Sequence, residues 1–175
     1  MENQKSASTS IMLNYGLILG FISILIAVAN FAFGDVYKPH WGMQVVSMAA
    51  TIIIIVFGLK KIKENNTGFL SLSDSLKTGL GIALISGIVF IVYFFVFVNY
   101  IEPDYFANAL KVAEATILET YPNWSDEQIE AAMTMSKKMS GIGMTAAMVM
   151  VMSLFFGFII SLIAGLIMKK SEEVD

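Results

Sequence analysis

Apolar side chains occur in four long runs along the chain, near residues 11–33, 42–59, 78–98 and 142–168. A helix of about 20 apolar residues, rising about 1.5 Å per residue, crosses the roughly 30 Å hydrocarbon core of a bilayer. Lipid offers no partner to an unpaired backbone N–H or C=O group, so each run is expected to be helical. The pattern therefore predicts an all-α fold, a four-helix transmembrane bundle that forms a single integral membrane domain over residues 1–175.

The segment between the third and fourth runs has a different pattern. Acidic residues flank Pro103, and proline is tolerated in the first turn of a helix, so a helix is expected to start near this residue. Pro122 marks a turn, after which Ser125 and Gln128 have the spacing of a capping box for a second helix. These features predict an extracytoplasmic helical hairpin over residues 102–140.

The second arm of this hairpin is expected to run on into the fourth span, although Gly141 and Gly143 would permit a break. Each arm has apolar residues at helical spacing, and the hairpin has seven acidic residues against three lysines. Two interpretations stay open: the stripes pack on each other and on the membrane surface, with the acids as a solvated face, or they form a receptor surface for a cationic ligand or a partner. The possible partner-binding residues are Phe106, Leu110, Ile117, Ile129 and Met133.

Composition excludes several classes of function. Hydrophobic residues make up 57% of the chain and charged residues 14%, whereas about a quarter of an ordinary soluble domain is charged. All 11 basic residues are lysines and 14 residues are acidic, so no basic patch indicates a nucleic-acid partner. The chain has no cysteine and one histidine, which makes a zinc site improbable. We expect no metal and no cofactor.

Lysine placement predicts the orientation. Seven lysines fall on one side of the four spans and four on the other, and the positive-inside bias assigns the richer side to the cytoplasm. Both termini are then cytoplasmic, and residues 34–41 and 99–141 face outward. The cytoplasmic lysines are Lys5, Lys60, Lys61, Lys63, Lys77, Lys169 and Lys170, and the outer ones are Lys38, Lys111, Lys137 and Lys138.

Small residues recur at every fourth position inside three of the spans. Such faces let helix backbones approach closely, which drives helix association in lipid. They predict packing within one four-helix bundle or, as the alternative, a homo-oligomer through the same faces. The absence of ionisable residues from the central part of each span makes a pore less probable. The helix-packing residues are Gly16, Gly20, Gly79, Ala83, Gly87, Gly157, Ser161 and Gly165.

The cytoplasmic connector between the second and third spans is expected to lie on the membrane. Its lysines can reach anionic headgroups, while Leu70 and Leu72 offer apolar side chains to the interface. Ser71 or Ser73 is expected to cap the third helix, with Asp74 in the first turn.

Candidate chemistry is sparse. Seven methionines crowd the end of the hairpin and the start of the fourth span, and thioethers can bind Cu(I), but packing is the better interpretation. His40 alone cannot define a site, and we expect it at the membrane interface. The sequence contains no nucleophile elbow, Walker loop or HExxH motif, and the paired acids of the hairpin look exposed. We therefore expect no catalytic residues and no enzyme activity.

Several short motifs resemble those of a known family. They are the lysines that end the second span, then Gly68-Phe69-Leu70-Ser71-Leu72, the segment Asn99-Tyr100-Ile101-Glu102-Pro103-Asp104-Tyr105, and a Met-rich last span. Together they resemble an uncharacterised bacterial integral membrane family, a domain of unknown function with the number four-one-nine-nine, over nearly the whole chain. The resemblance implies this topology and the bacterial inner membrane, and it supplies no catalytic residues.

The sequence thus favours a non-enzymatic accessory, sensing or scaffold protein in contact with the lipid bilayer and with a membrane protein partner. The alternative is a small oligomeric membrane transporter or channel, with the hairpin as an entrance vestibule. A continuous polar cavity would favour transport, and an exposed apolar patch on the hairpin would favour partner binding.

Overall fold

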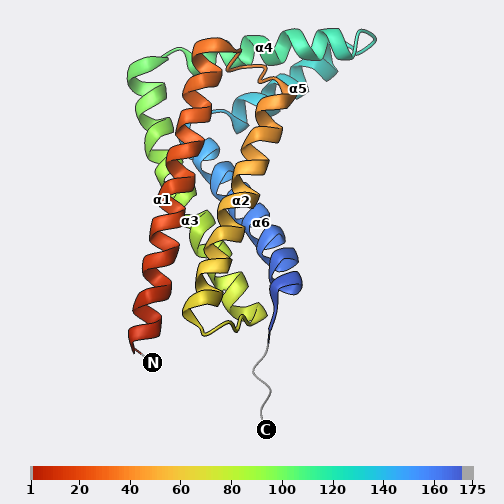
Figure 1. Ribbon diagram of the computed structural model, residues 1–175. Coiled ribbons are helices and arrows are strands. Elements are labelled where there is room, and N and C mark those ends of the chain that lie inside the picture. Colours follow the sequence, from red (N-terminus) through yellow and green to blue (C-terminus); the bar gives the residue numbers. More distant parts are fainter. Residues whose placement is uncertain (1, 171–175) are drawn as a thin grey trace. The chain divides into compact units, whose positions relative to one another are not determined.

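A computed structural model describes the backbone of residues 2–170 and the side chains of residues 7–170, so the side chain of Lys5 lies outside the described residues. The described chain consists of helices joined by short connectors, as Figure 1 shows. The all-α prediction is confirmed for the described residues, which form helices and no strand, and four of these helices are long and apolar enough to cross a membrane. The elements are α1 (Glu2–Phe33), α2 (Trp41–Asn65), α3 (Leu72–Val96), the π-helix η1 (Phe97–Ile101), α4 (Tyr105–Thr120), α5 (Asp126–Met139) and α6 (Ile142–Met168).

The helices extend beyond the apolar runs that predicted them. α2 continues through the lysines that follow its apolar run and ends at Asn65, because lysine is a good helix former. Thr67 and Gly68 then adopt positive φ angles of 52° and 93°, which a helix cannot continue through. α3 begins at Leu72, six residues before the predicted start of the span, and η1 extends it to Ile101. Hydropathy therefore identifies the apolar helices better than it locates their ends.

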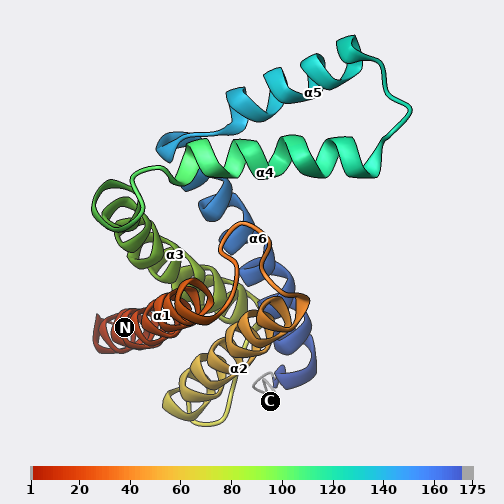
Figure 2. The same cartoon turned by 90° about the horizontal axis from the view of Figure 1, so that it is seen from above.

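By contacts between Cα atoms the chain divides into two compact units. The first unit joins the chain up to Phe90 with the chain from Met150 onward, and the second unit is Ile91–Val149. Within the first unit α1 and α2 lie side by side, and α3 lies between α1 and α6, as the view in Figure 2 shows. The prediction of a single domain stays a prediction.

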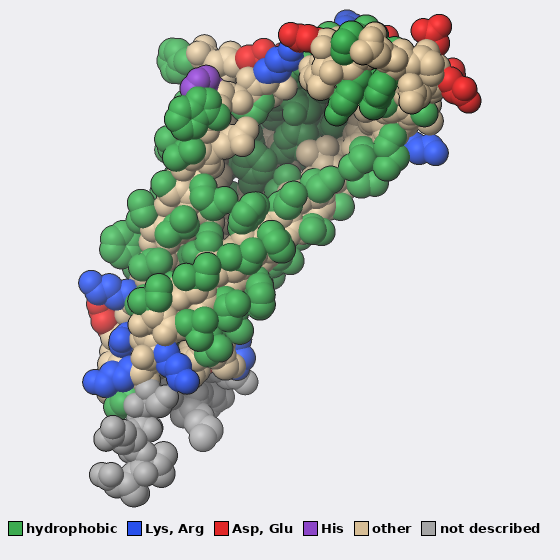
Figure 3. Space-filling model, turned by 90° about the vertical axis from the view of Figure 1, so that its right-hand side faces the viewer, with side chains coloured by type: hydrophobic (Ala, Val, Ile, Leu, Met, Phe, Trp, Pro, Cys, Tyr) green, Lys and Arg blue, Asp and Glu red, His purple; other side chains and the backbone are tan. Residues whose placement is uncertain are grey.

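The core of the first unit comes from all four long helices and from the connector between α2 and α3. Leu70 of the connector is 0% exposed, so the expectation that it faces the membrane interface was wrong. The outer sides of the helices carry large exposed apolar side chains, green in Figure 3, as a lipid-facing surface requires. The core residues are Ile11, Leu19, Ile55, Leu59, Ile62, Leu70, Ile82, Ile160 and Ala164.

The second unit contains α4 and α5, which lie against each other. The predicted capping box is confirmed: the Gln128 backbone N–H donates to Ser125 Oγ, and the Ser125 backbone N–H donates to Gln128 Oε1. α4 begins at Tyr105, two residues after Pro103, and the Tyr105 N–H bonds to the Glu102 carbonyl.

The expectation that the second arm runs on into the fourth span was wrong. α5 ends at Met139 and α6 begins at Ile142. Gly141 between them has a φ of 121°, which breaks the helical path and which a residue with a side chain rarely adopts. The extracytoplasmic side of this segment stays a prediction.

Candidate functional site

A seam of small residues joins α3 and α6 in the first unit. A Cβ atom added at Gly157 would lie 2.5 Å from Ala83 Cβ, and one added at Gly165 would lie 2.6 Å from Ser75 Cβ, so neither position has room for a side chain. The pairs are four residues apart in both helices, and the numbers rise along α3 while they fall along α6. This is the pattern of two antiparallel helices that keep a constant register. Four pairs form this seam: Ser75 with Gly165, Gly79 with Ser161, Ala83 with Gly157, and Gly87 with Ser153.

The hydroxyl groups of the seam bond to backbone carbonyls. Ser161, which is fully buried, donates to the Gly157 carbonyl at 2.6 Å. Ser153 donates across the seam to the Ala83 carbonyl at 2.7 Å. These bonds satisfy the hydroxyls in an apolar surrounding, and the cross-helix bond fixes the register of the two helices.

A second close contact joins α1 and α3. A Cβ atom at Gly16 would lie 2.6 Å from Ile85 Cβ, and one at Gly20 would lie 2.7 Å from Val89 Cβ. The two glycines therefore make room for the β-branched side chains of Ile85 and Val89, and α1 and α3 run parallel along this contact. All eight predicted helix-packing residues thus lie against another helix of the same chain, and a homo-oligomer through the same faces stays a prediction.

Sequence reasoning missed several residues of these contacts. Gly58 of α2 makes room for Ile82, and Gly81 of α3 makes room for Met12. Their partners are large side chains, so a search for small residues in pairs cannot find them. Ser75 could have been found, because it stands four residues before Gly79.

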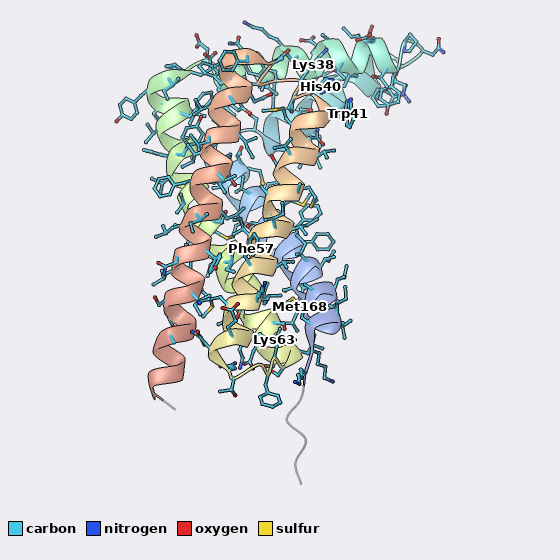
Figure 4. All side chains as sticks on the ribbon, viewed as in Figure 1. Lys38, His40, Trp41, Phe57, Lys63 and Met168 are labelled. Atoms are coloured by element: carbon cyan, nitrogen blue, oxygen red, sulfur yellow. The ribbon has the colours of Figure 1, made fainter. Side chains whose placement is uncertain are left out.

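Where α2 ends and α3 begins, the connector pairs with the end of α6. The Lys63 ammonium group donates to the Met168 carbonyl at 2.8 Å, and Figure 4 shows these two residues at one end of the first unit. Leu70 and Lys170 exchange both backbone hydrogen bonds, with N···O distances of 3.0 and 3.2 Å. The Lys170 Nζ atom lies 5.7 Å from the centre of the Phe69 ring. Lys63 donates to one of the last carbonyls of α6, which have no N–H donor within the helix and lie at the negative end of its dipole.

Ser71 caps α3, as one of the two predicted alternatives. The Asp74 N–H donates to Ser71 Oγ at 3.0 Å, and the Ser71 hydroxyl donates to Asp74 Oδ2 at 2.6 Å. Leu72 lies beside the small-residue seam, with its Cδ1 atom 3.2 Å from where a Cβ of Gly165 would be. The connector is therefore part of the packed end of the first unit.

The five predicted partner-binding residues are all half-buried in the second unit. Phe106 packs edge-on against Phe94 and Tyr105, with ring centroids 6.2 and 5.3 Å away. Burial in this aromatic cluster raises the pKa of the Tyr105 phenol. The half-buried residues of α4 and α5 follow helical spacing, so each helix has one covered side.

Other apolar residues of the hairpin are exposed. Leu118 is 49% exposed and Met135 59% exposed. At the turn, the rings of Tyr121 and Trp124 stack with centroids 4.1 Å apart and an interplanar angle of 9°. We call Leu118, Tyr121, Trp124, Met135 and Met139 the hairpin apolar residues.

The residues considered for chemistry do not assemble into a site in the described part of the chain. His40 caps α2 by accepting a hydrogen bond from the Gly42 N–H at 3.1 Å, and its ring lies against Trp41. Figure 4 shows His40 beside Lys38 and Trp41, at the end of the first unit away from Lys63. Among the described residues no three His, Asp or Glu side chains are close enough to hold a metal ion.

The comparisons with known proteins identify the family. The family described as "Protein of unknown function (DUF4199)" matches residues 14–170, so the chain belongs to it. The family resemblance is thus confirmed, and with the four apolar helices it indicates a multi-pass membrane protein. A search of curated proteins and a search of solved structures found no match.

Proposed function

We propose that this member of the family is a non-enzymatic accessory protein that binds a partner protein through its α4–α5 hairpin. The observation that carries the proposal is the set of hairpin apolar residues, which stay exposed although α4 and α5 pack against each other. A contiguous exposed apolar patch outside the predicted spans indicates a binding surface, and the hairpin apolar residues supply the exposed apolar side chains for one.

The charge of the hairpin defines the chemistry of the partner. Residues 99–140 have seven acidic residues and three lysines, and Glu119, Glu127 and Glu130 are exposed. A partner with an apolar groove and a basic rim would complement this surface, because opposite charges steer the encounter and exclude partners of like charge. The membrane surface and a second copy of the chain are the competing occupants.

The lysines support a membrane location and an orientation for the chain. The helices α1, α2, α3 and α6 anchor the chain in the bacterial inner membrane, with both termini in the cytoplasm and the hairpin outside. Support comes from the lysines, most of which lie at one side of the spans. The partner is therefore a membrane-associated or extracytoplasmic protein.

Transport would need a polar path through the first unit. The fully buried polar side chains of the first unit include Ser75 and Ser161. The Ser161 hydroxyl donates to the Gly157 carbonyl of its own helix, and the Ser75 hydroxyl donates to the carbonyl of Ser71, the residue that caps α3. Such groups serve helix packing, whereas an ion path needs groups that can bind the ion.

Photocrosslinking in native membranes tests the partner. A photoreactive residue at Leu118 or Met135 is expected to capture one and the same protein, and a probe at the exposed Phe57 of α2 is the matched control for lipid-facing positions. Replacing Glu119, Glu127 and Glu130 by Gln should lower the yield of this product several-fold, and raised salt should do the same.

The other outcomes exclude the proposal. Crosslinks to lipid alone would show that the hairpin apolar residues lie in the membrane surface. Crosslinks between identical copies would identify a homo-oligomer. A captured protein whose yield is the same from Phe57, or unchanged by the acid replacements, would be a bystander.

A further inference from the structure

Six lysines gather where α2 ends, α3 begins and α6 ends, and Figure 3 shows blue side chains gathered at the lower end of the molecule. The acidic residues described at this end are Glu64 and Asp74. Glu64 pairs with Lys61 at 3.2 Å, and Asp74 accepts the Ser71 hydroxyl. Most of the positive charge at this end therefore has no acidic partner in the described part of the chain. The six are Lys60, Lys61, Lys63, Lys77, Lys169 and Lys170.

Three of these lysines are brought together by contacts that join distant parts of the sequence. The Lys63 ammonium group is held by the Met168 carbonyl, which lies next to Lys169 in the chain. The backbone of Lys170 is fixed to that of Leu70 by two hydrogen bonds. Lys63, Lys169 and Lys170, which we call the lysine end site, therefore occupy a position set by the fold.

Exposed apolar side chains adjoin the lysine end site. Leu166 and Ile167, in the last turn of α6, are 58% and 79% exposed. Ammonium groups directly after an exposed apolar helix face match a phospholipid, whose acyl chains contact the apolar face while the phosphate meets the lysines.

We propose that the lysine end site binds the phosphodiester of an anionic phospholipid, with Lys63, Lys169 and Lys170 as donors. Lys63 keeps N–H groups for the phosphate, because an ammonium group has three donors and the Met168 carbonyl uses one. Lys60 and Lys77 add to the local positive potential. The adjoining apolar face selects a lipid over free phosphate.

The test uses the full chain purified in a neutral detergent and titrated with phosphatidylglycerol, with binding read by native mass spectrometry. Each lysine near a headgroup contributes about 1 kcal/mol, or about five-fold in affinity. Replacing Lys63, Lys169 and Lys170 together by Gln should therefore weaken binding roughly a hundred-fold. The matched control replaces the three hairpin lysines, Lys111, Lys137 and Lys138, by Gln and should leave the affinity within about two-fold.

Further variants keep the test independent of folding. Lys169→Gln removes no described side-chain contact and should weaken binding about five-fold. Replacing the three lysines by Arg keeps the charge and should keep binding. The full chain with Glu172, Glu173 and Asp175 replaced by Gln, Gln and Asn lacks three carboxylates that follow the site in sequence, and it should bind at least as tightly.

Several results would overturn the assignment. Equal binding of phosphatidylcholine would show that charge has no part in it. Displacement of the lipid by millimolar inorganic phosphate would identify a site for free anions. An equal loss in the hairpin-lysine control, or unchanged binding in both Lys169→Gln and the triple variant, would mean that the lipid binds elsewhere.

Discussion

The packing of Gly157 against Ala83 makes a prediction that isolates one contact of the fold. In Gly157→Ala the new Cβ would lie 2.5 Å from Ala83 Cβ, about 1 Å inside an ordinary carbon–carbon contact. Overpacking of this kind costs about 1–3 kcal/mol. Alanine also favours the helix over glycine by up to about 1 kcal/mol, so the single variant should lose about 0–2 kcal/mol of unfolding free energy.

The exchange variant Gly157→Ala/Ala83→Gly separates these two effects. Removing the Ala83 methyl leaves Ala83 Cα as the nearest atom of that residue, 3.9 Å from the new Cβ, which is ordinary contact. The helix propensities at the two positions add independently and cancel in a double-mutant cycle. The cycle should therefore show a favourable coupling of about 1–3 kcal/mol, equal to the steric cost that the exchange relieves.

Unfolding in mixed micelles with increasing sodium dodecyl sulfate, followed by circular dichroism, measures the four free energies of the cycle. Gly143→Ala is the matched control, because the same substitution in the same helix meets no atom within 4 Å. It should be neutral or slightly stabilising. A coupling below about 0.5 kcal/mol would mean that the two positions are independent, and it would refute the register of α3 against α6.

Three further predictions concern other parts of the molecule. Leu70→Ala should destabilise the first unit by about 2–5 kcal/mol, because the side chain is fully buried, and a loss below 1 kcal/mol in the same denaturant assay would contradict its place in the core. Ser125→Ala removes the capping box of α5 at a cost of about 1 kcal/mol, so hydrogen exchange should quicken in the first turn of α5 and stay unchanged in α2. The pKa of Tyr105 is raised from 10.0 because burial disfavours the phenolate, so the contribution of this group to stability is complete below pH 10 and is lost as the pH rises through the folded-state pKa. The tyrosinate absorbance of the protein and of Tyr105→Phe is measured against pH, and the difference between the two curves is the titration of Tyr105. Its midpoint should lie above pH 10, and a midpoint at or below pH 10 would contradict the burial.

Much of the local structure follows from short-range rules. The Ser125–Gln128 box and the Ser71 cap form as their spacing predicts, because a capping interaction needs only residues within one helical turn. The same rules left the junction at Gly141 open, since glycine is compatible both with a continuous helix and with the positive φ that the chain adopts. The expectation of a continuous helix failed at that residue.

The candidate sites were less predictable. The periodicity of α4 and α5 identified apolar stripes. The five predicted partner-binding residues, Phe106 among them, are half-buried, while Leu118 and Met135 stay exposed. Periodicity finds the apolar side of a helix without showing which part of it a neighbour covers. No sequence pattern predicted the pairing of Leu70 with Lys170. It joins segments a hundred residues apart through backbone atoms, which every residue type has.

The sequence alone determined the class of this protein, its four apolar helices and its family, because length and hydropathy decide whether a helix can cross a bilayer. Only the tertiary structure decided that the small residues of α6 meet those of α3, that Gly16 and Gly20 receive Ile85 and Val89, and that the connector joins the end of α6. In lipid an apolar face gains little from burial against another helix, so the choice of partner depends on how side-chain shapes fit between helices. That fit depends on both surfaces together, and the hydrophobic pattern of one helix does not contain it.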